Sequence, residues 1–208
     1  MEAATRKLWA DQDKHGGDRW RLFRAVAAAV GGRSVLYPGS FVDVAASFVW
    51  PVVTYVDVDR RAARFFTDVE GVAEIVGAHP GAPADPVISF VPGDYTEDLG
   101  LAANEFDLLV SLYAGFVSDH CTGHLKVGGH LLVNPSHGDA ALASIDRRYT
   151  LSGVVLSRSG QYVVSDRELD TYLVPKKPVD LSPEAIRARG RGVAYSRPAF
   201  AYLFRRVA

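Results

Sequence analysis

The stretch from Ser34 to Arg61, SVLYPGSFVDVAASFVWPVVTYVDVDRR, decides the fold of this chain. It opens with an apolar run, breaks at Pro38-Gly39-Ser40, and resumes as a β-branched run from Val52 to Val56 that ends in Asp57. An apolar run, a glycine turn and a second apolar run closed by an acid form the outline of the first βαβ unit of a nucleotide-binding sheet. The stretch therefore predicts an α/β fold built on a parallel sheet.

Two residues of this stretch predict ligand contacts. Gly39 has no Cβ, so the backbone leaving the first strand can turn sharply and bring its N–H groups close to a ligand. Asp57 follows eighteen residues later, where an acid at the tip of the second strand meets the hydroxyls of an adenosine ribose. The alternative for Asp57 is a strand-end acid in a solvated turn. Asp59 fits better as the N-cap of the next helix.

Composition favours one packed domain. The 208 residues are 48% hydrophobic and 11% aromatic, and the net charge of -1 gives no overall field that would attract nucleic acid or an anionic membrane. The one cysteine, Cys121, permits no internal disulfide, and no run reaches the roughly eighteen apolar residues that a membrane span needs. Because the N-terminus does not look like a signal peptide, we expect a cytoplasmic protein that does not enter a membrane.

The charge is unevenly distributed along the chain. Residues 176–208 carry eight Lys and Arg against two acids, whereas residues 1–175 carry fifteen against twenty-two. This basic segment is open to an anionic partner such as nucleic acid, although a solvated charged face is the simpler interpretation.

Apolar periodicity predicts the remaining elements. Residues 2–30 are expected to form two helical pieces around a Gly-Gly break. Residues 1–33 as a whole are expected to make an N-terminal helical cover. Further helices are expected at 60–78, 96–103, 117–125, 138–147 and 183–189. Beyond the first two strands, parallel strands are expected at 87–91, 106–112 and 130–134, and antiparallel strands at 149–156, 161–164 and 201–207.

The carboxyl ends of the third and fourth strands add candidate ligand residues. Ligands in open α/β sheets lie over the carboxyl ends of strands, so Asp94, which follows the third strand, points to the same crevice as Gly39 and Asp57. There Asp94 would accept a hydrogen bond from an adenine amino group, with the Tyr95 ring beside it. The alternative for Asp94 is an Asx turn or the cap of the helix expected at 96–103.

The order of these features resembles class I S-adenosylmethionine-dependent methyltransferases. The resemblance covers residues 34–134 and includes Phe-Asp-Leu-Leu-Val-Ser-Leu at the fourth strand and Leu-Lys-Val-Gly-Gly-His-Leu-Leu-Val at the fifth. It implies a Rossmann-like, mainly parallel sheet of seven strands, with helices on both faces and an antiparallel C-terminal strand pair. This domain would span residues 34–208, making one structural domain together with the cover.

The resemblance also implies S-adenosylmethionine as the cofactor. The residues that it places against the cofactor are Tyr37, Pro38, Gly39, Ser40, Asp57, Val58, Gly93, Asp94, Tyr95, Ser111, Leu112 and Tyr113. The family's first loop commonly reads acid-x-Gly-x-Gly-x-Gly, whereas this chain has one glycine there and a bulky Phe41. The fourth strand lacks the Asn/Asp-Pro-Pro-Tyr of many amino-group methyltransferases, which disfavours DNA-amine and glutamine methylation.

Methyl transfer requires an aligned nucleophile and a route for its proton. Candidate bases are Asp43, Asp119 and His120, with His15 from the cover as a further one, and each also has a surface or capping explanation. His120 and His124 are four residues apart with Asp119 beside them, a spacing compatible with zinc. No third ligand is evident, so we predict no metal.

Methyl transfer to a small or medium acceptor is therefore the leading hypothesis. One alternative is a methyltransferase-like binding or scaffold protein that has lost the cofactor, and affinity for the cofactor separates these two. A third hypothesis is nucleic-acid methylation through the basic segment 176–208, which salt-sensitive binding to RNA or DNA would support. The oligomeric state is left open.

Overall fold

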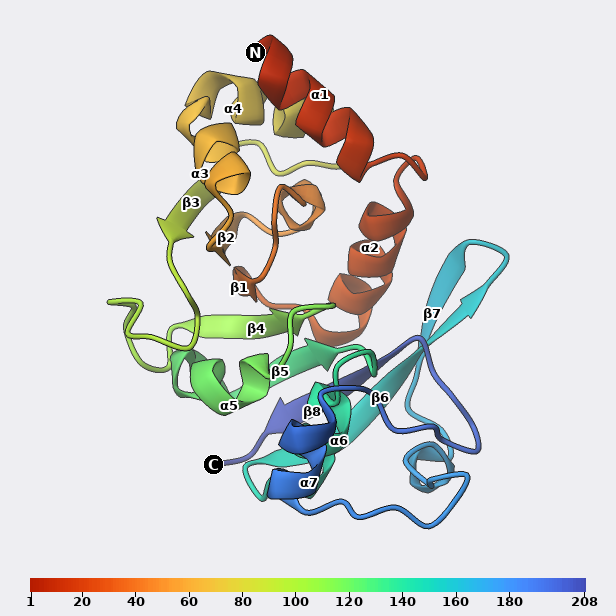
Figure 1. The fold of residues 1–208 in the computed structure, drawn as a ribbon. Helices are drawn as coiled ribbons and strands as arrows, with labels where there is room; N and C mark the ends of the chain where they lie inside the picture. The colour runs from red at the N-terminus through yellow and green to blue at the C-terminus, as the bar shows by residue number, and fades with distance from the viewer.

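A single eight-stranded sheet runs through the computed structural model, which describes residues 1–208 (Figure 1). Its order is β3-β2-β1-β4-β5-β8-β6-β7. Strands β1 to β5 pair in parallel, β8 is antiparallel to both β5 and β6, and β7 is antiparallel to β6. The predicted α/β class is confirmed. The strands are β1 (Ser34–Pro38), β2 (Val52–Asp57), β3 (Val87–Pro92), β4 (Phe106–Ser111), β5 (Leu125–Val133), β6 (Tyr149–Arg158), β7 (Gln161–Ser165) and β8 (Ala201–Arg206).

The sheet has one strand more than the seven that the resemblance implies. The additional strand is β7, which forms a hairpin with β6 around Ser159 and Gly160. Both turn residues have positive φ, 49° and 72°, as two-residue hairpin loops require to match the twist of their strands. The expected count of seven is therefore corrected to eight, because the chain extends β6 into a hairpin before it returns as β8.

The centre of the sheet is a topological switch point. From β1 the chain moves outward to β2 and β3 and then returns to β4 on the other side of β1. The connections leaving β1 and β4 therefore diverge at the carboxyl ends of these strands. Such a divergence leaves a crevice at which α/β proteins bind ligands.

Successive side chains of the central strands enter two separate cores. Val35 and Tyr37 of β1 belong to one buried cluster, whereas Leu36 between them belongs to the other. In β4, Leu108 and Val110 likewise belong to the first cluster, and Leu109 between them belongs to the second. This alternation is the strand periodicity of two, and it means that both faces of the sheet are covered.

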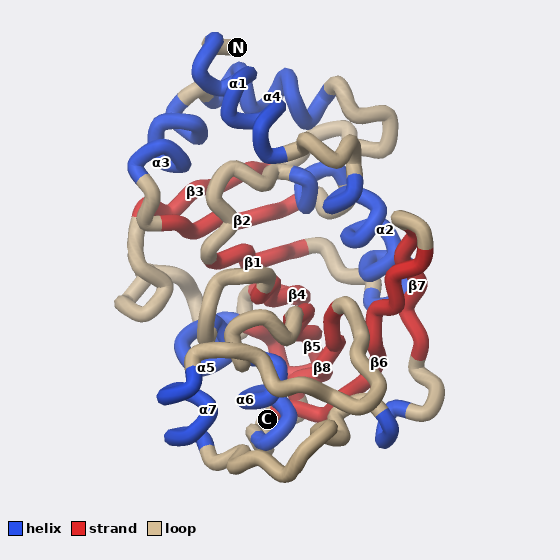
Figure 2. Tube along the Cα trace, turned by 45° about the vertical axis from the view of Figure 1, so that its right-hand side comes forward, coloured by secondary structure: helices blue, strands red, loops and turns tan.

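The helices divide between the two faces (Figure 2). Buried residues of α2, α3, α4 and η1 join the first cluster, and those of α5, α6 and α7 join the second. No helix combines the length and the apolar character that a membrane crossing requires. The helices are α1 (Ala3–Gln12), α2 (Asp18–Val30), α3 (Arg60–Thr67), α4 (Val69–Gly77), α5 (Val117–Cys121), α6 (Asp139–Ile145) and α7 (Pro183–Arg189), with 3-10 turns η1 (Ala45–Phe48), η2 (Thr122–His124) and η3 (Leu169–Thr171).

Two of the expected helices differ from the structure. The helix expected at 60–78 is divided into α3 and α4, because the Asp68 carboxylate accepts a hydrogen bond from the Gly71 N–H at 3.0 Å and starts a new helix. The helix expected at 96–103 does not form. Asp94 and Asp98 instead accept hydrogen bonds from the N–H groups two residues ahead, and such Asx turns compete with helical hydrogen bonding.

The second helix of the N-terminal cover is joined to the C-terminal half of the chain. The Tyr162 hydroxyl of β7 donates to the Asp18 carboxylate at 2.9 Å, and Arg21 Nε donates to the Gly160 carbonyl at 2.8 Å. Both contacts connect α2 to the β6–β7 hairpin, which lies beside it in Figures 1 and 2.

Candidate functional site

The loop after β1 makes a close turn at the switch point. Gly39 has φ of 66°, and a Cβ added to it would lie 2.4 Å from the Ala114 Cβ in the loop after β4. The Gly39 N–H donates to the Val56 carbonyl at 2.8 Å, which fixes the turn against β2. The glycine therefore allows two loops at the carboxyl end of the sheet to touch.

Asp57 supports this loop from the end of β2. Its Oδ2 accepts a hydrogen bond from the Phe41 N–H at 2.7 Å, and its Oδ1 accepts one from the Asp59 N–H at 2.8 Å. Phe41 has φ of 49°, a strained value for a residue with a large side chain. The carboxylate thus stabilises a backbone conformation that Phe41 would otherwise disfavour. Asp59 caps α3 as expected, through the Arg61 N–H.

A cavity of about 420 Å³ opens where these loops meet the ends of β3 and β4. We call it the cofactor-side cavity. Its volume lies within the range of about 300–1,000 Å³ that small-molecule sites occupy. Seven of the residues predicted for the cofactor line it, with Thr96 and Ala114 completing the wall: Gly39, Asp57, Val58, Gly93, Asp94, Tyr95 and Tyr113.

The other five residues predicted for the cofactor do not line this cavity. Tyr37 and Leu112 are buried, as is Ser40, and Pro38 ends β1. The Tyr37 hydroxyl donates to Asp43, and the Ser111 hydroxyl donates to Asp139. These side chains therefore hold the protein together beneath the crevice.

Asp94 and Tyr95 form the wall at the end of β3. Asp94 Oδ1 accepts hydrogen bonds from the N–H and the hydroxyl of Thr96, and these bonds lower the pKa of the Asp94 carboxyl below its ordinary value. The Tyr95 hydroxyl donates to the Ala114 carbonyl. Gly115 allows this approach, because a Cβ at that position would lie 2.7 Å from the Tyr95 hydroxyl.

The predicted bases lie in two separate places. Asp43 is 1% exposed and pairs with Arg19 at 2.9 Å; burial raises the pKa of the Asp43 carboxyl, while Arg19 opposes that rise. Together with His15 it lines a small cavity of about 70 Å³ under the N-terminal cover. Asp119 and His120 are on α5, across the sheet. The structure therefore does not bring the predicted bases together.

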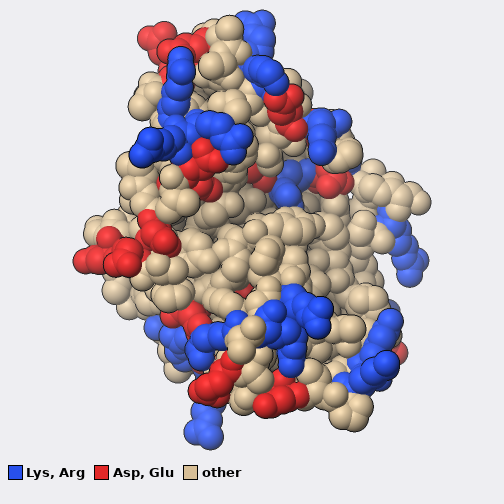
Figure 3. Space-filling view, in the orientation of Figure 1, with Lys and Arg blue, Asp and Glu red and all other residues tan.

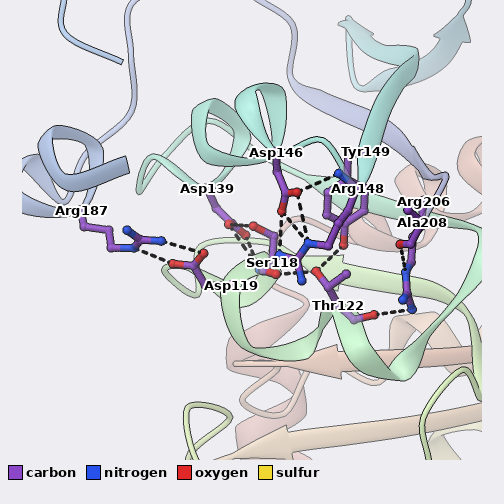
Figure 4. A network of polar contacts seen from close by, with 10 residues as sticks. All are labelled: Ser118, Asp119, Thr122, Asp139, Asp146, Arg148, Tyr149, Arg187, Arg206 and Ala208. Carbon is purple, nitrogen blue, oxygen red and sulfur yellow. Dashed lines mark hydrogen bonds and ion pairs between the residues drawn. The ribbon is translucent and has the colours of Figure 1, made fainter. Parts of the chain in front are cut away.

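The residues considered for zinc do not form a metal site. No group of three or more His, Cys, Asp or Glu side chains is arranged to hold an ion. Asp119 instead receives two hydrogen bonds from Arg187, at 2.8 and 3.1 Å (Figure 4). His124 Nδ1 lies 3.0 Å from the Ala102 carbonyl.

A second cavity, which sequence reasoning missed, lies on the other side of Tyr113. It has a volume of about 420 Å³ and is lined by Tyr113, Asn134, Pro135, Ser136, Gly192, Val193, Ala194 and Phe200. We call it the acceptor-side cavity. Tyr113 is 53% exposed, has φ of 61°, and donates its N–H to Asn134 Oδ1 at 3.2 Å. Tyr113 is thus a strained residue that contributes to both cavities, and no sequence pattern signals its φ.

A buried carboxylate lies behind the end of β4. Asp139, 1% exposed, accepts hydrogen bonds from the Ser118 hydroxyl at 2.5 Å and from the Ser118 N–H (Figure 4). It also accepts one from the Ser111 hydroxyl at 2.5 Å. Burial raises the pKa of this carboxyl to about 6, and the serine hydrogen bonds oppose the rise. The group therefore ionises near neutral pH in the folded protein.

This carboxyl predicts a pH dependence of stability. Its pKa is about 6 in the folded state and 3.8 ordinarily, so the folded protein binds the proton more tightly and stability falls as pH rises through this window. We expect the free energy of unfolding to fall by about 2 kcal/mol between pH 4 and pH 7 from this group. Urea denaturation across this pH range should show the fall in the wild type and not in Asp139→Asn. Parallel curves for the two proteins would contradict the assignment.

Comparison with solved structures supports the fold. No protein-family model and no curated protein matches the sequence. An inferred O-methyltransferase from Klebsiella pneumoniae aligns with a TM-score of 0.51 and 8% identity over 79% of this chain and 88% of its own. An O-methyltransferase from Bacillus cereus, solved in complex with SAH, aligns with a TM-score of 0.50 and 8% identity over 79% and 89% of the two chains.

A third similar structure is an inferred S-adenosyl-L-methionine-dependent methyltransferase from Methanococcus maripaludis. It aligns with a TM-score of 0.48 and 14% identity over 63% of this chain, and the alignment spans 61% of that protein, less than two thirds of its length. The sheet order together with the first two similarities shows that this chain has a class I methyltransferase-like fold.

Proposed function

We propose that the protein transfers a methyl group from S-adenosylmethionine to a small or medium-sized acceptor. The observation that carries this proposal is the cofactor-side cavity, which lies at the switch point of a class I methyltransferase-like sheet. It gathers two carboxylates, two tyrosine rings and an exposed valine from the ends of β2, β3 and β4. This combination of apolar wall and few polar groups is typical of small-molecule sites.

The lining residues fit the adenosine end of the cofactor. Each oxygen of Asp57 accepts one backbone N–H and retains a lone pair, so the carboxylate can also accept ribose hydroxyls. Asp94 uses only Oδ1 within the protein, which leaves Oδ2 for an amino group. Val58, 67% exposed, supplies an apolar surface beside them.

The acceptor would approach from the acceptor-side cavity, with Tyr113 between it and the cofactor. S-adenosylmethionine, when bound, supplies an electrophilic methyl group whose sulfur retains the electron pair of the broken bond. Among the predicted bases, Asp43 and Asp119 are paired with arginines. His120 is exposed and its ring lies 6.0 Å from that of Tyr95, but it lines neither cavity, so none of these three residues lies where the acceptor would bind.

Changing Val58 to aspartate should weaken binding of both S-adenosylmethionine and S-adenosylhomocysteine by about tenfold or more, because a charge replaces apolar surface on the cavity wall. Calorimetric titration of the purified protein measures this directly. The exposed position of Val58 means that the fold should be unaffected.

The matched control is Val69→Asp, at a valine of similar exposure (70%) on α4, outside the cavity. We expect it to bind the cofactor as the wild type does. If the folded wild type gives no heat with either ligand, the methyl-transfer proposal is wrong and the scaffold alternative takes its place. Equal weakening by both variants would remove the cavity as the binding site.

A further inference from the structure

A basic cavity adjoins the acceptor-side cavity. It has a volume of about 580 Å³, and none of its nine lining residues is acidic. Figure 3 shows Lys and Arg side chains gathered over the C-terminal half of the chain on this face. The lining residues are Lys176, Lys177, Pro178, Val179, Arg189, Arg191, Gly192, Val193 and Ala194.

Two backbone segments hold this cavity in shape. Residues 174–176 pair with residues 194–196 as a short antiparallel bridge, with the Lys176 N–H donating to the Ala194 carbonyl at 2.9 Å. The Gly192 N–H donates to the Ser136 carbonyl, and a Cβ on Gly192 would lie 1.7 Å from the Pro135 carbonyl oxygen. Only glycine permits this contact, so the wall shared by the two cavities is built by close backbone packing.

The cations of the basic cavity have no anionic partner in the protein. None of Lys176, Lys177, Arg189 and Arg191 forms an ion pair, and the only hydrogen bond from their side chains runs from Arg189 Nη2 to the Asp180 carbonyl. Arg189 Nη1 is buried without any hydrogen-bond partner. Unpaired guanidinium N–H groups at a concave wall are suited to bind carboxylate or phosphate oxygens.

Most of the other basic residues of the C-terminal segment form ion pairs or hydrogen bonds within the protein. Arg187 pairs with Asp119, and Arg197 pairs with Glu168. Arg206 donates to backbone carbonyls and to Asn104. The free positive charge is therefore concentrated at the cavity and does not form the long basic surface that a nucleic-acid backbone would follow.

The three cavities adjoin one another, with the acceptor-side cavity in the middle. Tyr113 and its loop border both the cofactor-side and the acceptor-side cavities, and residues 192–194 border both the acceptor-side and the basic cavities. A molecule in the acceptor-side cavity would have the methyl donor on one side and the unpaired cations on the other.

We propose that the methyl acceptor is a small anionic molecule whose carboxylate or phosphate group binds in the basic cavity through Lys176, Arg189 and Arg191. Its methyl-accepting atom then lies in the acceptor-side cavity, near Tyr113. The assignment of this anion to the acceptor rests on the proposed function, whereas the anion site itself does not.

The anion site can be tested with pyrophosphate and citrate as probes, titrated calorimetrically into the 208-residue protein at constant ionic strength. We expect at least one to bind, and Lys176→Gln/Arg191→Gln to weaken that binding by about tenfold or more. Both side chains are exposed and form no hydrogen bond or ion pair within the protein, so the variant should keep its melting temperature. The charge-matched control is Arg6→Gln/Lys14→Gln, at exposed and unpaired positions of the cover, which should bind as the wild type does.

The outcomes separate this inference from the proposed function. Preference for pyrophosphate indicates a phosphate-bearing acceptor, and preference for citrate indicates a carboxylate. If S-adenosylhomocysteine binds but neither anion does, or if both double variants weaken the anion equally, the anion site is wrong and methyl transfer stands. Anion binding without S-adenosylhomocysteine binding keeps the site and removes methyl transfer. If a single-stranded oligonucleotide binds where neither small anion does, the site belongs to nucleic acid and our inference is overturned.

Discussion

Replacing Gly39 with alanine should lower the free energy of unfolding by about 2 to 5 kcal/mol, because two independent penalties act at this position. The φ of 66° is unfavourable for any residue with a Cβ, and that Cβ would lie 2.4 Å from the Ala114 Cβ. Urea denaturation monitored by circular dichroism measures the loss. S-adenosylhomocysteine binding should weaken in parallel, since both residues line the cofactor-side cavity.

The steric part of this effect can be separated with a second substitution. Ala114→Gly removes the atom that the new Cβ would meet, so Gly39→Ala/Ala114→Gly should recover about 1 to 3 kcal/mol relative to Gly39→Ala. The backbone penalty at residue 39 should persist in the double variant. If the two substitutions are simply additive, the contact between these loops does not exist as described.

Replacing Asp43 with alanine should destabilise the protein by about 3 to 5 kcal/mol, the usual cost of leaving a buried charge without its partner. The Asp43 carboxylate, 1% exposed, accepts hydrogen bonds from the Tyr37 hydroxyl and the Ala45 N–H and pairs with Arg19, whose side chain is 24% exposed. Without it, the guanidinium and the phenol would both remain unpaired. Chemical denaturation at neutral pH provides the measurement.

Two variants of the same pair serve as controls. Asp43→Asn keeps the shape and the acceptor oxygen and should lose less than Asp43→Ala. Arg19→Met/Asp43→Leu removes both charges and should be more stable than Asp43→Ala, because no uncompensated charge remains. A double variant that is no more stable than the single one would contradict a coupled pair.

Local sequence patterns were sufficient to predict the central part of the fold. The β-branched run that ends in Asp57, the Gly-Asp after the third strand and the single glycine after the first strand are all short-range signals. They lie at strand ends, and parallel strands bring their carboxyl ends to one edge. For this reason Gly39, Asp57 and Asp94 come together in one cavity, although their role in cofactor binding stays a prediction.

The remaining features depend on contacts between distant segments. The acceptor-side and basic cavities share Gly192. Glycine is required there only because Pro135 is packed against it, and the residues around position 192 in the sequence do not show this contact. Tyr37 and Ser111 occupy strand ends, like the ligand residues, but their hydroxyls meet the buried Asp43 and Asp139. Strand position therefore predicted the neighbourhood of these side chains and not their partners.

The contacts between α2 and the β6–β7 hairpin have a consequence for how the chain assembles during synthesis. The residues that they join, Asp18 with Tyr162 and Arg21 with Gly160, are 144 and 139 positions apart. Because the ribosome synthesises α2 before the hairpin, α2 must wait until the β6–β7 hairpin has emerged before these partners are present. In a nascent chain that lacks the hairpin, α2 should therefore be less protected from hydrogen exchange and proteolysis than in the finished fold.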